Sequence, residues 1–327
     1  MERYVAIDDV CAWPNLTLLP NGDIVALLFD QPCHGGWEGD VACWASDDGG
    51  HLWTKRGDVS AHAPGTVRMN HAAGVAHDGA LLALVSGYDH KAPRGQQPPE
   101  GASQFLPAEA CRSYDGGRNW QRAQSVCLPQ GYHQLIPFGD IVQGPEGVLA
   151  AALYSFESRQ VNDALVLFSS DDGHTWRESA LIGAADYNET ALTVLQDGAW
   201  LAAIRTVRDA HLALFSSRDL GRTWTMRGDL SLPNQHPGHL LQLADGRVLL
   251  TLGLRNPGLA GVGVRLSGDG GQTWGALSVL VTLDDARDAG YPTSVQLADG
   301  TVVTAYYASG VQTHMRYHMG VLRWQVP

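Results

Sequence analysis

The sequence predicts an all-β fold, a six-bladed β-propeller with four-stranded antiparallel blades. Three observations predict it. One eight-residue turn motif occurs five times, six hairpin dipeptides interleave with it, and no linker or low-complexity stretch interrupts either pattern. Repeats at blade-like intervals are typical of propellers. We therefore expect the 327 residues to form a single domain over 1–327.

The turn motif is Ser-x-Asp-x-Gly-x-x-Trp. Its Asp can accept hydrogen bonds from the backbone N–H groups of a turn, its Gly allows a positive φ, and its Trp covers the turn with apolar surface. Five of the ten tryptophans occupy the last position, which predicts a structural role. The copies run from Ser46 to Trp53, Ser113 to Trp120, Ser169 to Trp176, Ser217 to Trp224 and Ser267 to Trp274.

The second repeat is a hairpin dipeptide between alternating apolar runs. Asn-Gly and Asp-Gly between two strands are the strongest short hairpin signal. Each repeat then consists of an inner strand, this hairpin turn, a second strand, a third strand, the Ser-x-Asp turn and an outer strand. The six dipeptides are Asn21-Gly22, Asp78-Gly79, Glu146-Gly147, Asp197-Gly198, Asp245-Gly246 and Asp299-Gly300.

The sixth repeat has no Ser-x-Asp turn. Its last predicted strands, Thr301–Tyr307 and Met319–Gln325, are followed by the end of the sequence. Its outer strand must therefore come from elsewhere, and Arg3–Ile7 is the predicted donor. Pairing of the N- and C-terminal segments would close the ring and remove an exposed sheet edge.

Composition excludes some classes of partner. The formal net charge is −12, from 22 basic and 34 acidic residues, and such a surface repels nucleic acid backbones. No stretch approaches the roughly 18 apolar residues of a membrane span, and the first residues do not resemble a signal peptide. We expect no nucleic acid partner, no membrane association and a cytoplasmic location. The oligomeric state stays open.

Candidate binding residues precede or begin the predicted inner strands. In a propeller these strands line a central channel, and the loops that enter them form one face. Polar and aromatic side chains stand at these places, as a converging pocket requires. The candidates for substrate binding are Trp13, Asn70, His71, His133 and His239.

At this point the whole chain resembles the sialidase (neuraminidase) superfamily. The turn motifs are similar to the Asp-boxes of that family, which also occur in non-enzymatic propellers. Three further segments are more specific. Asn188-Glu189-Thr190, followed by Arg205, is similar to the family's fourth-blade segment. Arg255 resembles another substrate-binding arginine, and Ala289-Gly290-Tyr291-Pro292 resembles the sixth-blade segment that carries the catalytic tyrosine.

The resemblance implies an exo-acting, retaining glycoside hydrolase with an unusual nucleophile. Sialidases use a tyrosine where most retaining glycosidases use a carboxylate. The anomeric carbon of sialic acid already bears a carboxylate, which would repel a second anion. Tyr291 would be the nucleophile and Glu189 its base, while Arg205 and Arg255 would bind the carboxylate of a sialic-acid-like sugar.

Two positions depart from the family pattern. Ala12-Trp13-Pro14 stands where sialidases have an Arg-Ile-Pro motif, so the first of three carboxylate-binding arginines is absent. Arg68, at the start of the second inner strand, is the candidate substitute. The general acid, an Asp on the first-blade loop in the family, could be Asp40, which has the right residue type, or Glu38, which has the nearer spacing.

Histidines also gather near the predicted channel face, at His34, His71, His133, His236 and His239. No pair has the tight spacing of a zinc motif, and we predict neither a metal nor a cofactor. Binding of sugar hydroxyls, ordering of loops and acid–base catalysis all remain open for them.

Three functions stay open at this stage. The first is the sialidase-like hydrolase. The second is a propeller enzyme with another chemistry, either a different exo-glycosidase or a polysaccharide lyase that would release an unsaturated product. The third is a non-catalytic glycan-binding propeller that kept the turn motifs only. Each of them predicts a carbohydrate partner.

Overall fold

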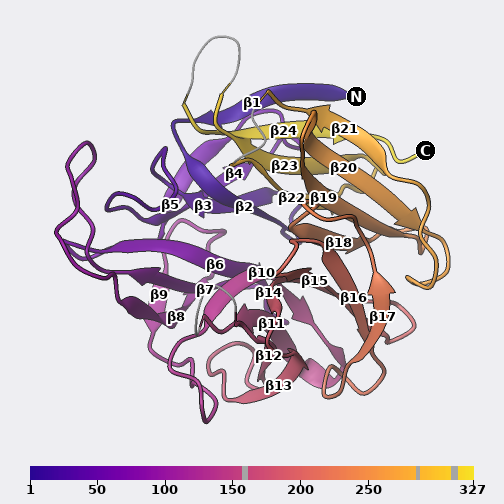
Figure 1. The fold of residues 1–327 in the computed structure, drawn as a ribbon, viewed down its shortest axis with the longest axis horizontal. Coiled ribbons are helices and arrows are strands. Elements are labelled where there is room, and N and C mark those ends of the chain that lie inside the picture. Colours follow the sequence, from indigo (N-terminus) through magenta and orange to yellow (C-terminus); the bar gives the residue numbers. More distant parts are fainter. Residues whose placement is uncertain (157–160, 285–287, 311–315) are drawn as a thin grey trace.

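The computed structural model describes residues 1–156, 161–284, 288–310 and 316–327. Within these residues the chain forms 24 β-strands and one short 3₁₀ turn, η1 (Pro145–Gly147). The strands are arranged as blades around a centre, so the all-β propeller prediction is confirmed (Figure 1). The described residues contain no helix long and apolar enough to cross a membrane.

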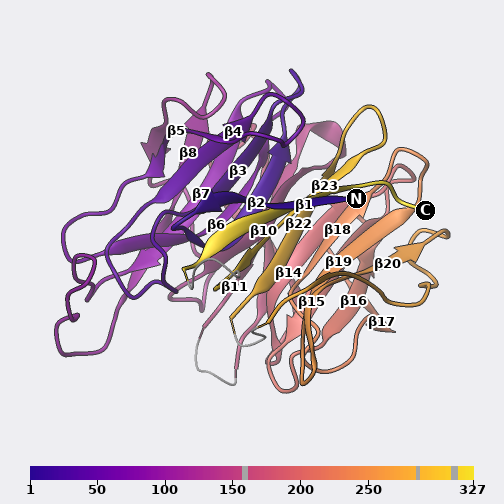
Figure 2. The same cartoon turned by 90° about the horizontal axis from the view of Figure 1, so that it is seen from above.

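Four blades are separate four-stranded antiparallel sheets. In each of them one strand lies against the centre and the others follow outward (Figures 1 and 2). Listed from the inner strand, they are β2 (Cys11–Leu18), β3 (Ile24–Phe29), β4 (Val41–Ser46) and β5 (Thr54–Ser60); β14 (Tyr187–Val194), β15 (Trp200–Thr206), β16 (Leu212–Ser217) and β17 (Thr225–Asp229); β18 (Gly238–Gln242), β19 (Val248–Asn256), β20 (Leu259–Ser267) and β21 (Ser278–Thr282); and β22 (Gly290–Gln296), β23 (Val302–Ala308), β24 (His318–Trp324) and β1 (Glu2–Asp8).

The other eight strands form one continuous sheet, which corrects the expectation of six separate blades. Its two halves are joined by parallel pairing of Gly139 and Asp140 with Ala72 and Ala73. Gly74 permits this approach, because a Cβ at that position would lie 2.1 Å from a backbone oxygen of the facing strand. The halves are β6 (Val67–Val75), β7 (Leu81–Tyr88), β8 (Phe105–Ser113) and β9 (Gln121–Ala123), and β10 (Ile136–Gln143), β11 (Leu149–Tyr154), β12 (Ala164–Ser169) and β13 (Glu178–Gly183).

The ring is closed by the two ends of the chain. Strand β1 pairs antiparallel with β24, from Glu2 opposite Arg323 to Asp8 opposite His318. Ile7 of β1 is buried in a core cluster shared by the last and first blades. Figure 1 shows β1 and β24 side by side at the rim. The predicted pairing of Arg3–Ile7 with the last blade is confirmed.

The five Ser-x-Asp turns share one hydrogen-bond pattern. In the fourth copy, Ser217 Oγ donates to Asp219 Oδ1 at 2.7 Å, and the backbone N–H of Thr223 donates to the same oxygen at 2.9 Å. Gly221 N–H donates to Ser217 Oγ at 3.0 Å, and Trp224 Nε1 donates to the carbonyl of Gly221 at 2.8 Å. The motif therefore folds its own turn, as predicted from its residue types.

Candidate active site

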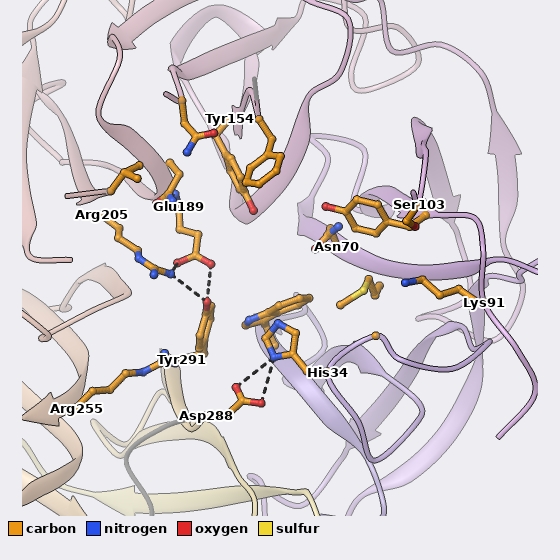
Figure 3. A pocket seen from close by; sticks show the side chains of 18 residues that line it. His34, Asn70, Lys91, Ser103, Tyr154, Glu189, Arg205, Arg255, Asp288 and Tyr291 are labelled. Carbon is orange, nitrogen blue, oxygen red and sulfur yellow. Dashed lines mark hydrogen bonds and ion pairs between the residues drawn. The ribbon is translucent and has the colours of Figure 1, made fainter. Parts of the chain in front are cut away.

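A cavity of about 810 Å³ opens where the inner strands begin (Figure 3). This end is opposite the Ser-x-Asp turns, because inner strands run toward those turns and third strands end in them. Its lining comes from most of the ring. The residues are Trp13, His34, Gly35, Met69, Asn70, Tyr88, Lys91, Ser103, Tyr154, Phe156, Asn162, Asn188, Glu189, Arg205, Val207, Arg255, Asp288 and Tyr291.

The inner strands present these residues through irregular pairing. A β-bulge re-aims a side chain and increases the local twist, and bulges are frequent next to active sites. Five inner strands shift register in their first residues, at the cavity end. The shifts lie between Cys11 and Asn15 in β2, Arg68 and Asn70 in β6, Phe138 and Ile141 in β10, Tyr187 and Thr190 in β14, and Gly290 and Thr293 in β22. Trp13, Glu189 and Tyr291 each lie inside such a shift.

The backbone at Tyr291 is held in an uncommon conformation. Tyr291 has φ of 49°, and Gly290 before it has φ of 95°. A Cβ at Gly290 would lie 3.1 Å from the Cα of Gly253 in the neighbouring blade. Left-handed backbone at a non-glycine residue is maintained only where the surrounding structure imposes it. The close contact between the two glycines therefore helps to fix the direction of the Tyr291 side chain.

Tyr291 and Glu189 meet across two blades. Tyr291 Oη donates to Glu189 Oε1 at 2.5 Å, and Arg205 Nη1 donates to the other carboxylate oxygen at 2.8 Å (Figure 3). Both Tyr291 and Glu189 are buried. Burial raises the pKa of Tyr291 well above its usual value, and the Glu189 charge adds to this, against the opposing effect of Arg205 and Arg255. The phenol is therefore neutral at rest and has a carboxylate in place to accept its proton.

Two guanidinium groups flank the Tyr291 ring. Arg205 Nη1 lies 3.5 Å from Tyr291 Oη, and the Arg255 guanidinium carbon lies 5.3 Å from the ring centroid. Arg255 Nη2 donates to the carbonyl of Ala289 at 2.8 Å, which orients the group. Nearby, burial and then the charges of both arginines lower the pKa of His236 to about 2. The positive potential of the pair therefore keeps that imidazole neutral.

Ala12 stands where the family pattern has an arginine, and Trp13, the next residue, lines the cavity. The ring centroid of Trp13 lies 5.6 Å from that of Tyr291 and 5.1 Å from that of His34. The first-blade side of the cavity is therefore an aromatic wall. The cavity also contains Asn70, a predicted residue, whose side chain is buried.

Sequence reasoning missed a second polar group in the cavity. His34 Nδ1 lies 3.2 Å from both carboxylate oxygens of Asp288, and the hydroxyls of Tyr307 and Tyr317 donate to the same carboxylate. Burial would raise the pKa of Asp288, but the hydrogen bonds and charge of His34 and the two tyrosine hydroxyls hold it well below its usual range. The position of Asp288, three residues before Tyr291, is the signal that could have revealed it.

The predicted general acids, Asp40 and Glu38, do not line the cavity. Asp40 Oδ1 accepts hydrogen bonds from the backbone N–H of His62 and from its Nδ1, both at 2.6 Å. Glu38 Oε1 accepts from the backbone N–H of Gly65 at 2.5 Å. Both carboxylates thus hold the loop before β6, and the expectation that one of them faces the substrate is corrected.

Arg68 also lies outside the cavity lining. Its Nη1 donates to the carbonyl of Pro107 at 3.1 Å, so its guanidinium is directed toward the neighbouring β8. Arg68 precedes the register shift of β6 and Asn70 follows it, and of these two it is Asn70 that lines the cavity. The expectation that Arg68 replaces the missing arginine is corrected.

Three predicted histidines are placed elsewhere. His71 is buried, with Nδ1 3.1 Å from the carbonyl of Met69 and Nε2 3.1 Å from that of Leu27. His239 Nε2 lies 2.9 Å from Asp140 Oδ2. Both line a small void of about 30 Å³ that Tyr291 also borders, outside the main cavity. His133 is exposed and does not line the cavity.

Within the described ranges, one group of carboxylates has the spacing of a cation site. Asp30, Asp40 and Asp58 each offer an oxygen, and these oxygens lie within 4.8 Å of one another, outside the cavity. Two of these carboxylates already have a basic partner: Lys55 Nζ lies 2.7 Å from Asp58, and His62 Nδ1 contacts Asp40. The group is therefore accounted for by protein contacts.

Comparison with known proteins identifies the family of the chain. Residues 22–304 match the BNR repeat-like domain. The chain belongs to this family. It is thus a member of the sialidase/BNR-repeat superfamily, whose fold is a propeller.

Individual relatives of this BNR repeat-like protein are distant. It is 25% identical over 360 residues to a sialidase from Micromonospora viridifaciens. The alignment covers 99% of this chain and 54% of that protein, so the chain spans about half the length of this relative. A crystal structure of a Dyadobacter fermentans protein of unknown function has a TM-score of 0.85 at 24% identity and covers 100% of this chain and 98% of that one. The Hadza microbial sialidase Hz136 has a TM-score of 0.75 at 19% identity. The match covers 99% of this chain and 68% of that one.

Proposed function

We propose that this protein is an exo-acting glycoside hydrolase that removes a terminal acidic, sialic-acid-like sugar. The observation that carries the proposal is the hydrogen bond of 2.5 Å between Tyr291 Oη and Glu189 Oε1 inside a cavity that also holds Arg205 and Arg255. Distant sialidase relatives support a sialidase-like glycosidase at the level of the family.

Tyr291 would attack the anomeric carbon. A buried phenol with a raised pKa is a poor nucleophile unless a base removes its proton during the attack. Glu189 lies within hydrogen-bond reach for that task, and Arg205 holds the second oxygen of the same carboxylate. Because the nucleophile is neutral until it reacts, a substrate that bears its own carboxylate at the reacting carbon is not repelled.

Arg205 and Arg255 would bind the substrate carboxylate. Both arginines line the cavity beside Tyr291. A planar guanidinium can bind a carboxylate through two parallel hydrogen bonds. Because Ala12 stands where the family has a third arginine and Trp13 lies beside it, we propose that the sugar places its carboxylate between these two arginines and its apolar face on the indole.

The ring architecture belongs to the same proposal. We propose that β6–β9 and β10–β13 act as two blades of one propeller, so that six inner strands surround the site. The binding surface would then draw on every part of the ring, which suits a pocket that encloses one terminal sugar.

Hydrolysis of an aryl sialoside tests the proposal, with wild type, Tyr291→Phe and Tyr114→Phe compared. Tyr291→Phe removes the nucleophile, so we expect turnover to fall by about a thousandfold or more. Tyr114 is exposed and lies outside the cavity, and its loss should leave turnover unchanged. Turnover that survives Tyr291→Phe would overturn the mechanism. An unsaturated, ultraviolet-absorbing product would indicate a lyase, and binding of sialosides without turnover would indicate a glycan-binding propeller.

A further inference from the structure

We propose that His34 is the general acid of this site and that Asp288 is its positioning residue. The inference rests on the proposed hydrolase function and adds the proton donor that the function requires. Glycoside hydrolysis needs a group that protonates the leaving oxygen. Both carboxylates that the sequence suggested for this role, Asp40 and Glu38, bind the backbone of another loop and do not line the cavity.

His34 occupies the same first-blade loop as those two carboxylates, but it lines the cavity. Its side chain is about half exposed, at 48%, so it can meet a bound substrate. Nδ1 faces the Asp288 carboxylate, which fixes the ring orientation and leaves Nε2 as the nitrogen for substrate. In the described part of the chain, Nε2 of His34 has no hydrogen-bond partner.

The proposed acid, His34, and the proposed nucleophile, Tyr291, both contact the same aromatic ring. The Trp13 ring contacts both His34 and Tyr291. Behind them, Tyr307 donates to Asp288 through its hydroxyl, and its ring centroid lies 5.5 Å from that of Tyr291. Figure 3 shows the His34–Asp288 pair beside Tyr291 in the same cavity. A sugar seated on Trp13 would therefore have a nucleophile and a proton donor within its reach.

Asp288 suits a positioning role. A carboxylate on one imidazole nitrogen selects the tautomer and stabilises the imidazolium form. The hydroxyls of Tyr307 and Tyr317 bind the same carboxylate and hold it in place. Asp288 itself directs its oxygens to these three partners, so it acts on the reaction through His34.

The proposed reaction balances in two steps. First, Tyr291 Oη bonds to the anomeric carbon as the carbon–oxygen bond to the leaving group breaks; the phenol proton passes to Glu189, and the Nε2 proton of His34 passes to the leaving oxygen. Second, water bonds to the anomeric carbon as the bond to Tyr291 breaks; a water proton returns to His34 Nε2, and Glu189 returns its proton to the phenolate.

Leaving-group dependence tests the proposal. A 4-nitrophenyl sialoside releases an acidic phenol that departs without protonation, whereas a methyl sialoside releases an alcohol that requires it. General acid catalysis contributes about 100- to 10,000-fold. We expect His34→Gln to lower kcat/KM on the methyl sialoside by that factor and on the nitrophenyl sialoside by less than about tenfold. Asp288→Asn should show the same selectivity with a smaller loss.

His62→Gln is the matched control, because His62 also binds a carboxylate through Nδ1 but lies outside the cavity lining. It should leave both substrates unaffected. Equal losses on both substrates in His34→Gln would overturn the proposal, as would selective loss in Asp40→Asn instead. If His34→Gln does not fold, His34→Asn replaces it under the same criteria. Wild type that cleaves neither sialoside would refute the proposed function itself, and the acid role with it.

Discussion

At the scale of single residues, Arg205 and Arg255 differ in the protein groups to which they donate hydrogen bonds. Arg205 Nη1 holds a carboxylate oxygen of Glu189, whereas Arg255 Nη2 holds the backbone carbonyl of Ala289. Burial alone would lower the pKa of Arg205, but the charge and hydrogen bond of Glu189, together with the nearby tyrosines Tyr291 and Tyr154, raise it. Arg205 is therefore part of the nucleophile assembly, and Arg255 only flanks it.

This difference predicts distinct kinetics for the two alanine variants. Each would lose the proposed charge-assisted contact with the substrate carboxylate, of about 1.5–3 kcal/mol, so KM should rise by about ten- to a hundredfold in both. Arg205→Ala should in addition lower kcat, because Glu189 loses its ion-pair partner. Steady-state kinetics on an aryl sialoside separate the two. Arg208→Ala is the control, because Arg208 is exposed and follows Val207 of the cavity lining without lining the cavity itself. An unchanged kcat in Arg205→Ala would contradict this division.

At the scale of elements, the sequence was most informative about where the strands lie. It was least informative about the register shifts in the inner strands, which position the side chains of the cavity. Alternating apolar residues and Asp-Gly turns have local causes, and these predicted the strands, the turns and the use of Arg3–Ile7 to close the ring. The proximity of Tyr291 to Glu189 followed from the family resemblance. A bulge has no composition of its own, however, so the choice of Asn70 over Arg68 could not be foreseen. Glu38 and Asp40 were misplaced because their loop partners come from later in the chain.

The bulge of β22 makes a prediction that separates site geometry from stability. Gly290→Ala and Gly198→Ala both place a Cβ at positive φ, at 95° and 80°, which costs about 1–2 kcal/mol. A Cβ at Gly198, in a hairpin turn, meets nothing within 4 Å, whereas one at Gly290 presses on Gly253. We expect both to lower the melting temperature, but only Gly290→Ala to lower kcat/KM, by about tenfold or more, since Tyr291 would shift. Equal activity in the two variants would exclude a role for this contact.

At the scale of the whole molecule, the two ends of the blades have separate tasks. The cavity end carries the bulges, and the opposite end carries the five Ser-x-Asp turns. The turn carboxylates share one electrostatic property. Hydrogen bonds from Thr223 and Ser217 lower the pKa of Asp219 to about 2, and the corresponding aspartates of the other four turns are also lowered.

The shared shift predicts acid sensitivity of the fold. A carboxylate whose pKa is lower in the folded state stabilises the fold above its unfolded pKa of about 3.9, and this contribution is lost as pH falls toward about 2. Asp219→Ala should therefore lower the free energy of unfolding by about 1 kcal/mol at pH 7 and by less near pH 2.5. Urea denaturation at both pH values measures this. Asp47→Ala, at an exposed neighbouring position of the first turn, is the control, and a constant difference for Asp219→Ala would contradict the assignment.

The pairing of β1 with β24 sets an order of events during synthesis. Strand β1 is synthesised about 310 residues before its partner strand β24, which is about 15–60 s earlier at ordinary elongation rates. Throughout that interval the nascent ring is open. Tyr291 lies in the blade that β1 and β24 complete, and it is synthesised about a hundred residues after its hydrogen-bond partner Glu189. For the proposed hydrolase, activity would therefore report ring closure, because a chain without its last blade would keep most of its hydrogen bonds but lack the Tyr291–Glu189 pair.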